Sequence, residues 1–275
     1  MSGPGPLVPP ARRLARALRV PAGVGAGRRV VERNVTSARR SAVVLLSGFA
    51  EPVFYLFSLG VGLGALIGPV QADGRDVGYA QFVAPALLAT SAMNGAVMDS
   101  TFNVFWKLKY AHVYDAMLAT PLGPRDVAVG EITWALLRGG LYAAMFLAVM
   151  ALAGLVSSWW ALLAVPAALL VGFAFAGAGM AATTFMRSWQ DFELVTLVTL
   201  PLLLFSATFY PVTAYPGAVR AVVAVTPLYH GVELLRSLTL GTVDAGILGH
   251  VAYLLAMGAA GLAVAGSRLE RLLLT

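Results

Sequence analysis

Cysteine is absent from this 275-residue sequence, and charged side chains make up only 12% of it. Without cysteine, the chain has no disulfide framework, no thiolate metal site and no cysteine nucleophile. A soluble globular domain carries about 25% charged residues and about 45–50% apolar ones, whereas 59% of the residues here are hydrophobic. This excess of apolar side chains needs a solvent other than water, so the composition predicts an integral membrane protein.

Acidic side chains are few as well: the sequence has 13 Asp and Glu residues, compared with 19 Lys and Arg residues. The basic excess does not indicate a nucleic-acid partner, since the basic residues gather near the N-terminus and beside apolar runs, as topology determinants do. Residues 1–27 are rich in Pro, Gly, Ala and Arg. We interpret them as a flexible cytoplasmic tail, because no apolar segment of signal-peptide length follows their arginines before residue 41. Residues 28–275 are expected to form one membrane domain.

The apolar runs predict an all-α fold with six transmembrane helices. A bilayer core of about 30 Å needs about 20 apolar residues per helix, which places the spans at 42–68, 80–105, 127–154, 160–186, 191–210 and 245–267. Residues 211–244 are too rich in proline and polar residues for a simple span, yet too apolar for a free loop. They predict two re-entrant helices that dip into the bilayer from the outer side. Lys and Arg lie mainly on the N-terminal side of the spans, so both termini should face the cytoplasm.

Two connecting segments are amphipathic. Residues 28–40 alternate arginine with valine, which predicts either a helix in the headgroup layer or a solvated basic linker. Between the second and third spans, apolar residues recur at three- and four-residue spacing, and polar residues occupy the other face. The apolar set is Trp106, Tyr110, Val113, Tyr114, Met117 and Leu118, and the polar set is Lys107, Lys109, His112 and Asp115. This predicts one short helix on the cytoplasmic surface that ends near Pro121. It is either a membrane-surface helix or a docking element for a soluble partner, and the periodicity does not distinguish between these two roles.

Small and charged residues inside the spans suggest contacts between helices. Gly60, Gly64 and Gly68 recur every four residues and favour close helix packing. Five charged residues fall within or at the edge of spans: Glu51, Asp99, Glu131, Arg138 and Glu193. A charge at the bilayer centre costs about 2.5–3.5 kcal/mol on insertion scales, so each needs a partner, a water path or an edge position. Structural pairing between helices is the favoured interpretation, and the lining of a substrate path or gate is the alternative.

Candidate catalytic and metal-binding groups are scarce. His112, His230 and His250 appear scattered between opposite sides of the membrane, which argues against a metal site. The sequence shows no Ser-His-Asp order, paired carboxylate motif or glycine-rich nucleotide loop. The chain is therefore not expected to be an enzyme or to bind a cofactor itself.

Two segments, DAMLATPL at 115–122 and PLYHGVELLR at 227–236, are the most specific of a set that also includes residues 82–93, 126–134 and 205–211. Together they resemble the permease subunits of type-2 ATP-binding-cassette (ABC) exporters, in the branch of nodulation lipooligosaccharide and daunorubicin-type drug exporters. The resemblance covers about residues 28–270. It implies a membrane subunit that exports an amphipathic substrate, such as a lipid-linked glycan, a lipooligosaccharide or a hydrophobic drug, across the inner cell membrane.

The resemblance also implies partners and roles. Two permeases, identical or sister subunits, would pair with two separate ATPases that bind ATP and Mg, surrounded by membrane lipid. The cytoplasmic helix would be the coupling helix, with ATPase contacts from Lys109, Tyr110, His112, Val113, Tyr114, Asp115, Met117 and Leu118. Residues 28–40 would form an interfacial connecting helix. Glu233 and Arg236 would pair at an outer gate, one helical turn apart. The expected substrate path is lined by Met93, Asn94, Met98, Asn103 and Trp134.

The alternative is a membrane protein that does not depend on ATP. A secondary transporter could use Asp99, Glu131 or Glu193 as a proton relay, and a membrane scaffold would need no relay at all. Inverted repeats would favour a secondary transporter, and the sequence shows no convincing one.

Overall fold

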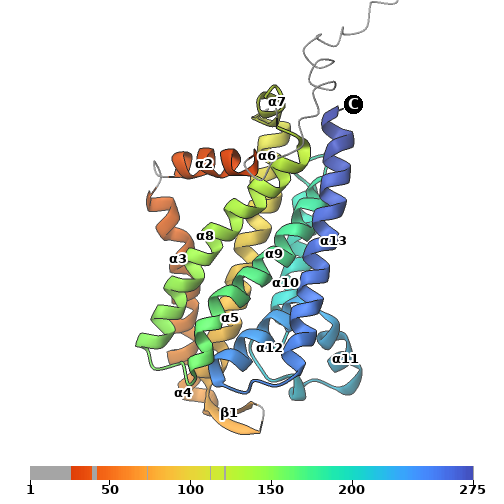
Figure 1. Cartoon of the computed structure of the whole chain (residues 1–275). Helices are drawn as coiled ribbons and strands as arrows, with labels where there is room; N and C mark the ends of the chain where they lie inside the picture. The colour runs from red at the N-terminus through yellow and green to blue at the C-terminus, as the bar shows by residue number, and fades with distance from the viewer. Residues whose placement is uncertain (1–25, 39–41, 73, 112, 121, 275) are drawn as a thin grey trace, which may run out of the picture.

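The structure is a computed structural model that describes residues 26–38, 42–72, 74–111, 113–120 and 122–274. The greater part of the predicted N-terminal tail, residues 1–25, lies outside this described part. Long helices run side by side between two ends, with the C-terminus and α7 at one end and a β-hairpin at the other (Figure 1). We call these the α7 end and the hairpin end.

The first half of the chain builds one side of the bundle and the α7 end. Helix α2 lies across the bundle axis near the α7 end, and α3 then runs to the hairpin end (Figure 1). The elements in order are α2 (Ala26–Ala38), α3 (Ala42–Phe57), the π-helical η2 (Ser58–Leu63), α4 (Gly64–Ile67), β1 (Pro69–Ala72), β2 (Arg75–Gly78), α5 (Tyr79–Met98), the π-helical η3 (Asp99–Asn103), α6 (Val104–Lys109) and α7 (Val113–Leu118).

The second half completes the bundle. It contains α8 (Pro124–Leu152), the 3₁₀ turn η4 (Trp159–Leu163), α9 (Ala164–Thr183), α10 (Asp191–Leu204), the 3₁₀ turn η5 (Val212–Ala214), α11 (Gly217–Val225), α12 (Pro227–Leu240) and α13 (Gly246–Leu274). Helix α8 starts with proline at its first position, where the missing N–H costs no helical hydrogen bond. The Asp126 carboxylate accepts a hydrogen bond from the Gly123 N–H at 2.9 Å.

Judged by length and composition, fewer helices could cross a membrane than the six spans that the sequence predicts. Four helical stretches of the described chain are long and apolar enough to cross a bilayer, at 50–67, 126–152, 159–183 and 246–271. Helices α11 and α12 together could supply a fifth, but they bend by 84° at their junction. The bend agrees with two short helices in 211–244. Helix α5 is not among these stretches and α10 has only 14 residues, so six crossings stay a prediction.

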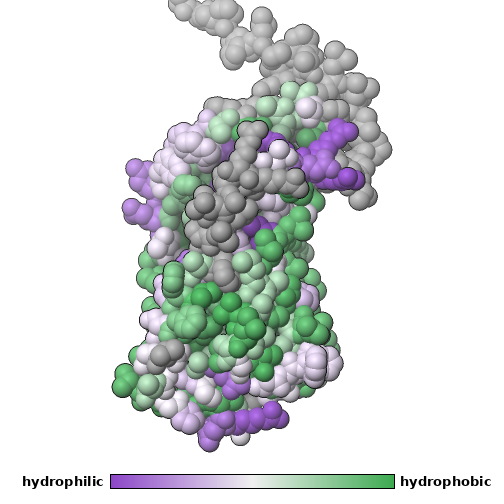
Figure 2. All heavy atoms as spheres, turned by 90° about the vertical axis from the view of Figure 1, so that its left-hand side faces the viewer, coloured by the Kyte–Doolittle hydropathy of each residue, from purple (hydrophilic) through white to green (hydrophobic). Residues whose placement is uncertain are grey.

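Helix α5 forms the centre of the core. Its buried side chains include Phe82, Leu88 and Met93, and it contacts α3, α8, α9 and α12. Most of its side chains therefore pack against protein. The face drawn in Figure 2 shows an apolar region between more polar ends.

Of the three glycines spaced by four residues in the first predicted span, Gly60 serves helix packing. A Cβ added at Gly60 would lie 3.1 Å from the Ala80 Cβ on α5, so this glycine lets the two helices approach closely. Gly68 instead ends α4 with φ of 73°. The antiparallel hairpin that follows pairs Val70 with Val77, and it is a small β element that the all-α prediction missed.

Candidate functional site

A buried carboxylate near the α7 end joins three elements. Glu131 lies in the second turn of α8 and is buried. Its Oε2 accepts hydrogen bonds from the Lys107 Nζ of α6 at 2.6 Å and from the Asn34 Nδ2 of α2 at 3.2 Å. The Glu131 side chain is only 4% exposed, so the ion pair is screened little by water. Helices α2, α6 and α8 are therefore tied together at one point.

Tyr114 of α7 is the fourth member of this group. It is buried, and neither its hydroxyl nor Glu131 Oε1 has a hydrogen-bond partner among the described residues. Burial and the neighbouring Glu131 charge raise the pKa of Tyr114 well above its usual value. The phenol therefore stays neutral beside the Glu131 carboxylate. We call Asn34, Lys107, Tyr114 and Glu131 the Glu131 node.

The predicted cytoplasmic helix is broken in two. Helix α6 ends at Lys109, and α7 begins at Val113. The exposed positions are Lys109 and Tyr110, Val113 is half-buried, and Tyr114 and Met117 are buried against the rest of this chain. His112 and the side chains of Asp115 and Leu118 lie outside the described part of the structure. Part of the predicted apolar face thus packs inside this chain instead of facing outward.

Six aromatic side chains link α6 to the start of α10: Phe102, Phe105, Trp106, Tyr110, Trp189 and Phe192. Trp106 stacks on Tyr110 with ring centroids 5.2 Å apart, and Phe192 meets Phe105 edge-on at the same separation. The sequence placed Trp106 and Trp189 near the same membrane boundary. It gave no signal that the two would meet, because 83 positions separate them.

A second buried ion pair lies deeper in the bundle. Asp99 of η3 accepts a hydrogen bond from the Asn103 Nδ2 at 2.6 Å and forms an ion pair with the Arg138 guanidinium of α8. Glu131 and Arg138 therefore each pair with the α5–η3–α6 segment. Pairing between helices is the favoured interpretation of the charges in the spans. It applies to Asp99, Glu131 and Arg138. Glu51 and Glu193 are exposed.

Arg236 in α12 is the corresponding buried charge near the hairpin end. It is 3% exposed, and its Nη1 donates to the Glu233 Oε1 at 2.6 Å, which is the predicted pair. Its Nη2 donates to the Ala207 carbonyl at 2.7 Å and its Nε to the Phe82 carbonyl at 3.4 Å. The guanidinium also lies 3.9 Å from the centre of the Phe82 ring. One side chain thus holds α12, α5 and the segment after α10 together.

The five predicted substrate-path residues do not form one group. Met93 is buried in the core and Asn103 is bound to Asp99, whereas Met98 is exposed and Asn94 and Trp134 are partly exposed. A large cavity lies beside α10 instead, and its lining includes Val97 and Thr101 but none of the five.

Two of the three histidines meet, contrary to the expectation that all three are scattered. The Nδ1 atoms of His230 in α12 and His250 in α13 are 2.7 Å apart, and the His230 ring stacks on Tyr253. Sequence spacing missed this contact because α12 folds back on α13. Among the described residues, no group of three or more His, Cys, Asp or Glu side chains could hold a metal ion.

Comparison with known proteins gives a consistent set of matches. The model of the ABC-2 type transporter family matches residues 28–240. Nodulation protein J of Rhizobium leguminosarum bv. viciae is 36% identical over 228 residues, which cover 82% of this chain and 86% of that protein. Nodulation protein J of Rhizobium meliloti (strain 1021) is 33% identical over 216 residues, covering 78% and 80%. The family match contains the Glu131 node and Arg236.

Proposed function

Because the chain belongs to the ABC-2 type transporter family, we propose that it is the membrane-spanning permease subunit of an ABC exporter. A separate ATPase subunit would bind ATP and Mg and supply the energy. The substrate would be amphipathic, such as a lipid-linked glycan, a lipooligosaccharide or a hydrophobic drug. The name shared by the relatives, nodulation protein J, favours a glycolipid over a drug.

The topology that we propose has six crossings in the inner cell membrane, with the α7 end in the cytoplasm. Residues 1–27 would be a cytoplasmic tail and residues 28–275 one membrane domain. Helix α10 and the continuous segment α5–η3–α6 would supply the two crossings that composition alone does not identify. Helix α2 would lie in the headgroup layer, because Val30 and Asn34 face the bundle while Arg28 and Arg33 are exposed. Helices α11 and α12 would be the re-entrant pair on the outer side.

The observation that carries the proposal is the Glu131 node. A partner that pushes on α7 would act on α2, α6 and α8 together, because Lys107 and Asn34 bind the same buried carboxylate. Breaking a buried ion pair costs about 3–5 kcal/mol, so these elements should move as one body. This rigidity is what a coupling element needs in order to convert ATPase closure into movement of α8.

Alternating access would follow from two such permeases, either two copies of this chain or one copy with a sister subunit. ATP binding would close the ATPases, the α7 ends would approach, and the hairpin ends would separate. Arg236 and Glu233 would hold the outer gate in its closed form. The path would run between the two permeases past Met93, Asn94, Met98, Asn103 and Trp134, of which Met98 is already exposed on this chain.

Copurification with a candidate ATPase tests the docking part of the proposal. The double variant Lys109→Glu with Asp115→Arg reverses charges in the α6–α7 region and leaves the buried Tyr114 intact. We expect loss of the ATPase and of ATP-dependent transport from a permease that still elutes as a folded protein. The matched control is Arg75→Glu with Asp76→Arg, since both are exposed in the hairpin at the opposite end.

A second variant separates docking from transmission. Glu131→Gln removes the charge that holds Lys107 but leaves the exposed surface unchanged. We expect the ATPase to bind normally while the amount of substrate moved per ATP hydrolysed falls. An ATPase that binds the α6–α7 charge reversal as well as wild type, or transport that continues without ATP, would instead favour a proton-driven transporter or a scaffold.

A further inference from the structure

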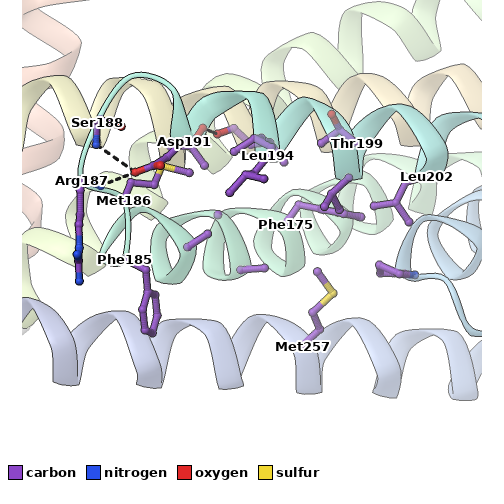
Figure 3. A pocket seen from close by; sticks show the side chains of 18 residues that line it. Phe175, Phe185, Met186, Arg187, Ser188, Asp191, Leu194, Thr199, Leu202 and Met257 are labelled. Atoms are coloured by element: carbon purple, nitrogen blue, oxygen red, sulfur yellow. Dashed lines mark hydrogen bonds between the residues drawn. The ribbon is translucent and has the colours of Figure 1, made fainter.

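A large apolar cavity separates α10 from the rest of the bundle. Its volume is about 840 Å³, and α5, η3, α9, α10 and α13 contribute to its walls. Its apolar lining includes Leu194, Val198 and Leu202 of α10, Phe175 of α9 and Met257 of α13 (Figure 3). The lining residues Leu194 and Val198 are 60% and 59% exposed, so the cavity opens to the surroundings of the bundle and can accept an apolar occupant from there.

The length of the cavity matches one leaflet of a bilayer. It extends along α10 from Asp191 to Leu202. Eleven residues at about 1.5 Å rise each give about 16 Å, close to half of the roughly 30 Å hydrocarbon core. One extended acyl chain would fit this length with its polar end at the α7 end.

Arg187 lines the α7 end of the cavity, and Arg268 lies beside it against the lining residue Phe185. Arg187 is exposed at the edge of the cavity and forms no ion pair with the described residues. The Arg268 guanidinium of α13 lies 3.8 Å from the ring centre of Phe185, which also lines the cavity. The Arg268 Nε is buried without a hydrogen-bond partner in the described part of the chain. A buried donor left in this state is costly, which indicates a missing acceptor.

The neighbouring acidic residue does not supply that acceptor. Asp191 Oδ2 accepts hydrogen bonds from the backbone N–H groups of Arg187 at 2.6 Å and Ser188 at 3.1 Å (Figure 3). These bonds also occupy the N–H groups before α10, so the arginine side chains remain as the donors for an anion.

We propose that this cavity binds one acyl chain of an anionic phospholipid, with the headgroup phosphate held by Arg187 and Arg268. Guanidinium groups bind phosphate oxygens through charge-assisted hydrogen bonds, and the apolar walls accept the chain. The lipid fills the gap between α10 and the bundle and supports α10 where the protein does not. The site does not depend on what the protein transports.

Photo-crosslinking of the full chain in detergent micelles tests this site. The probe is phosphatidylglycerol with a diazirine at the end of one acyl chain, and the comparison probe is phosphatidylcholine with the same chain. We expect labelling near Leu202 and Met257, at the apolar end of the cavity. Phosphatidylcholine should label these positions several-fold less, because its headgroup carries no net negative charge.

Five variants, two of them controls, assign the labelling to the two parts of the lipid. Arg187→Gln and Arg268→Gln should each lower phosphatidylglycerol labelling by about fivefold, as expected for one basic residue near an anionic lipid. Arg220→Gln on exposed α11 is the control. Val198→Trp should block the cavity and lower labelling by both probes, whereas Leu248→Trp, at an exposed position of α13, should not. Because Arg187 is exposed, its variant tests the headgroup even if Arg268→Gln folds poorly.

Three results would overturn the proposal. Equal labelling by both probes, unchanged in Arg187→Gln, would mean that the cavity does not select the headgroup. Absence of lipid labelling from a chain that still binds inorganic phosphate through Arg187 would mean that the arginines bind a free anion without the chain. Absence of label in the cavity, together with cross-links between two copies of the chain along α10, would mean that a second protein fills the space.

Discussion

Helices α9 and α10 follow one another along the chain and both consist largely of apolar residues, yet their surroundings are opposite. Twelve residues of α9 are buried, whereas none of α10 is. Helix α9 contacts α5, α8, α12 and α13 over its length. Helix α10 lies beside the cavity. Apolar character alone therefore does not tell which helix faces protein.

Residue size explains the difference. Helix α9 is rich in Ala and Gly, and Gly177 approaches α13 so closely that an added Cβ would lie 2.6 Å from the Gly258 carbonyl oxygen. Helix α10 contains neither Ala nor Gly. Lipid tails are as apolar as leucine, so helices in a membrane associate through close packing instead of through the hydrophobic effect. Small residues supply that packing in α9, and the large residues of α10 prevent it.

The ends of α10 are attached where its middle is not. Near its start, Phe192 and Trp189 join the aromatic cluster with Phe105. Beyond its last residue, the Ala207 carbonyl is bound by Arg236, and the Tyr215 hydroxyl donates to the Leu204 carbonyl at 3.1 Å. Helix α10 is thus fixed at two points, while α9 is fixed along its length.

The largest expected effect comes from breaking the attachment near the hairpin end. Arg236→Met should lower the free energy of unfolding by about 3–5 kcal/mol, the usual cost of removing one partner from a buried ion pair. Glu233 would lose its cation, and the Ala207 carbonyl would lose its donor. The measurement is thermal unfolding in detergent. Glu233→Gln is the control, because it leaves both carbonyl contacts of Arg236 in place and should cost less. An equal loss in both variants would show that the ion pair alone provides the stability.

The close crossing of α9 and α13 should be the next most sensitive feature. A Cβ added at Gly261 would lie 2.3 Å from the Gly177 carbonyl carbon, whereas one at Gly249 on the same helix meets nothing within 4 Å. Gly261→Leu should therefore cost about 1–3 kcal/mol, as overpacking does, because the clash is with backbone. Gly249→Leu should be near neutral. Similar melting temperatures for the two variants would contradict the close packing that separates α9 from α10.

Much of the bundle could be predicted from the sequence, because hydropathy and helix periodicity are local. Each predicted span overlaps helical structure, and the Glu233–Arg236 pair, which the family resemblance implied at i, i+3 spacing, is present. The break between α6 and α7 was missed, because apolar periodicity continues across residues 110–112. The hairpin at 69–78 was missed too, since its strands have four residues each.

Contacts between distant elements could not be predicted in the same way. The sequence indicated that Glu131 needs a partner, but Asn34 is 97 positions away, and only the fold brings α2 onto α8. His230 and His250 meet because α12 turns back on α13. The cavity beside α10 depends on how far a helix lies from its neighbours, which hydropathy does not encode.

The smallest expected effect is in the middle of α10. Leu197 is 67% exposed, so Leu197→Ala should change the free energy of unfolding of the isolated chain by less than about 0.5 kcal/mol. Leu254→Ala is the matched control, because Leu254 on α13 is fully buried and its truncation should cost about 2–5 kcal/mol. Both are measured by thermal unfolding in detergent. A loss at Leu197 approaching that at Leu254 would mean that the middle of α10 is packed in solution, as in a dimer through this helix. Repeating the measurement at increasing protein concentration separates these cases, because only stability that depends on a second copy rises with concentration.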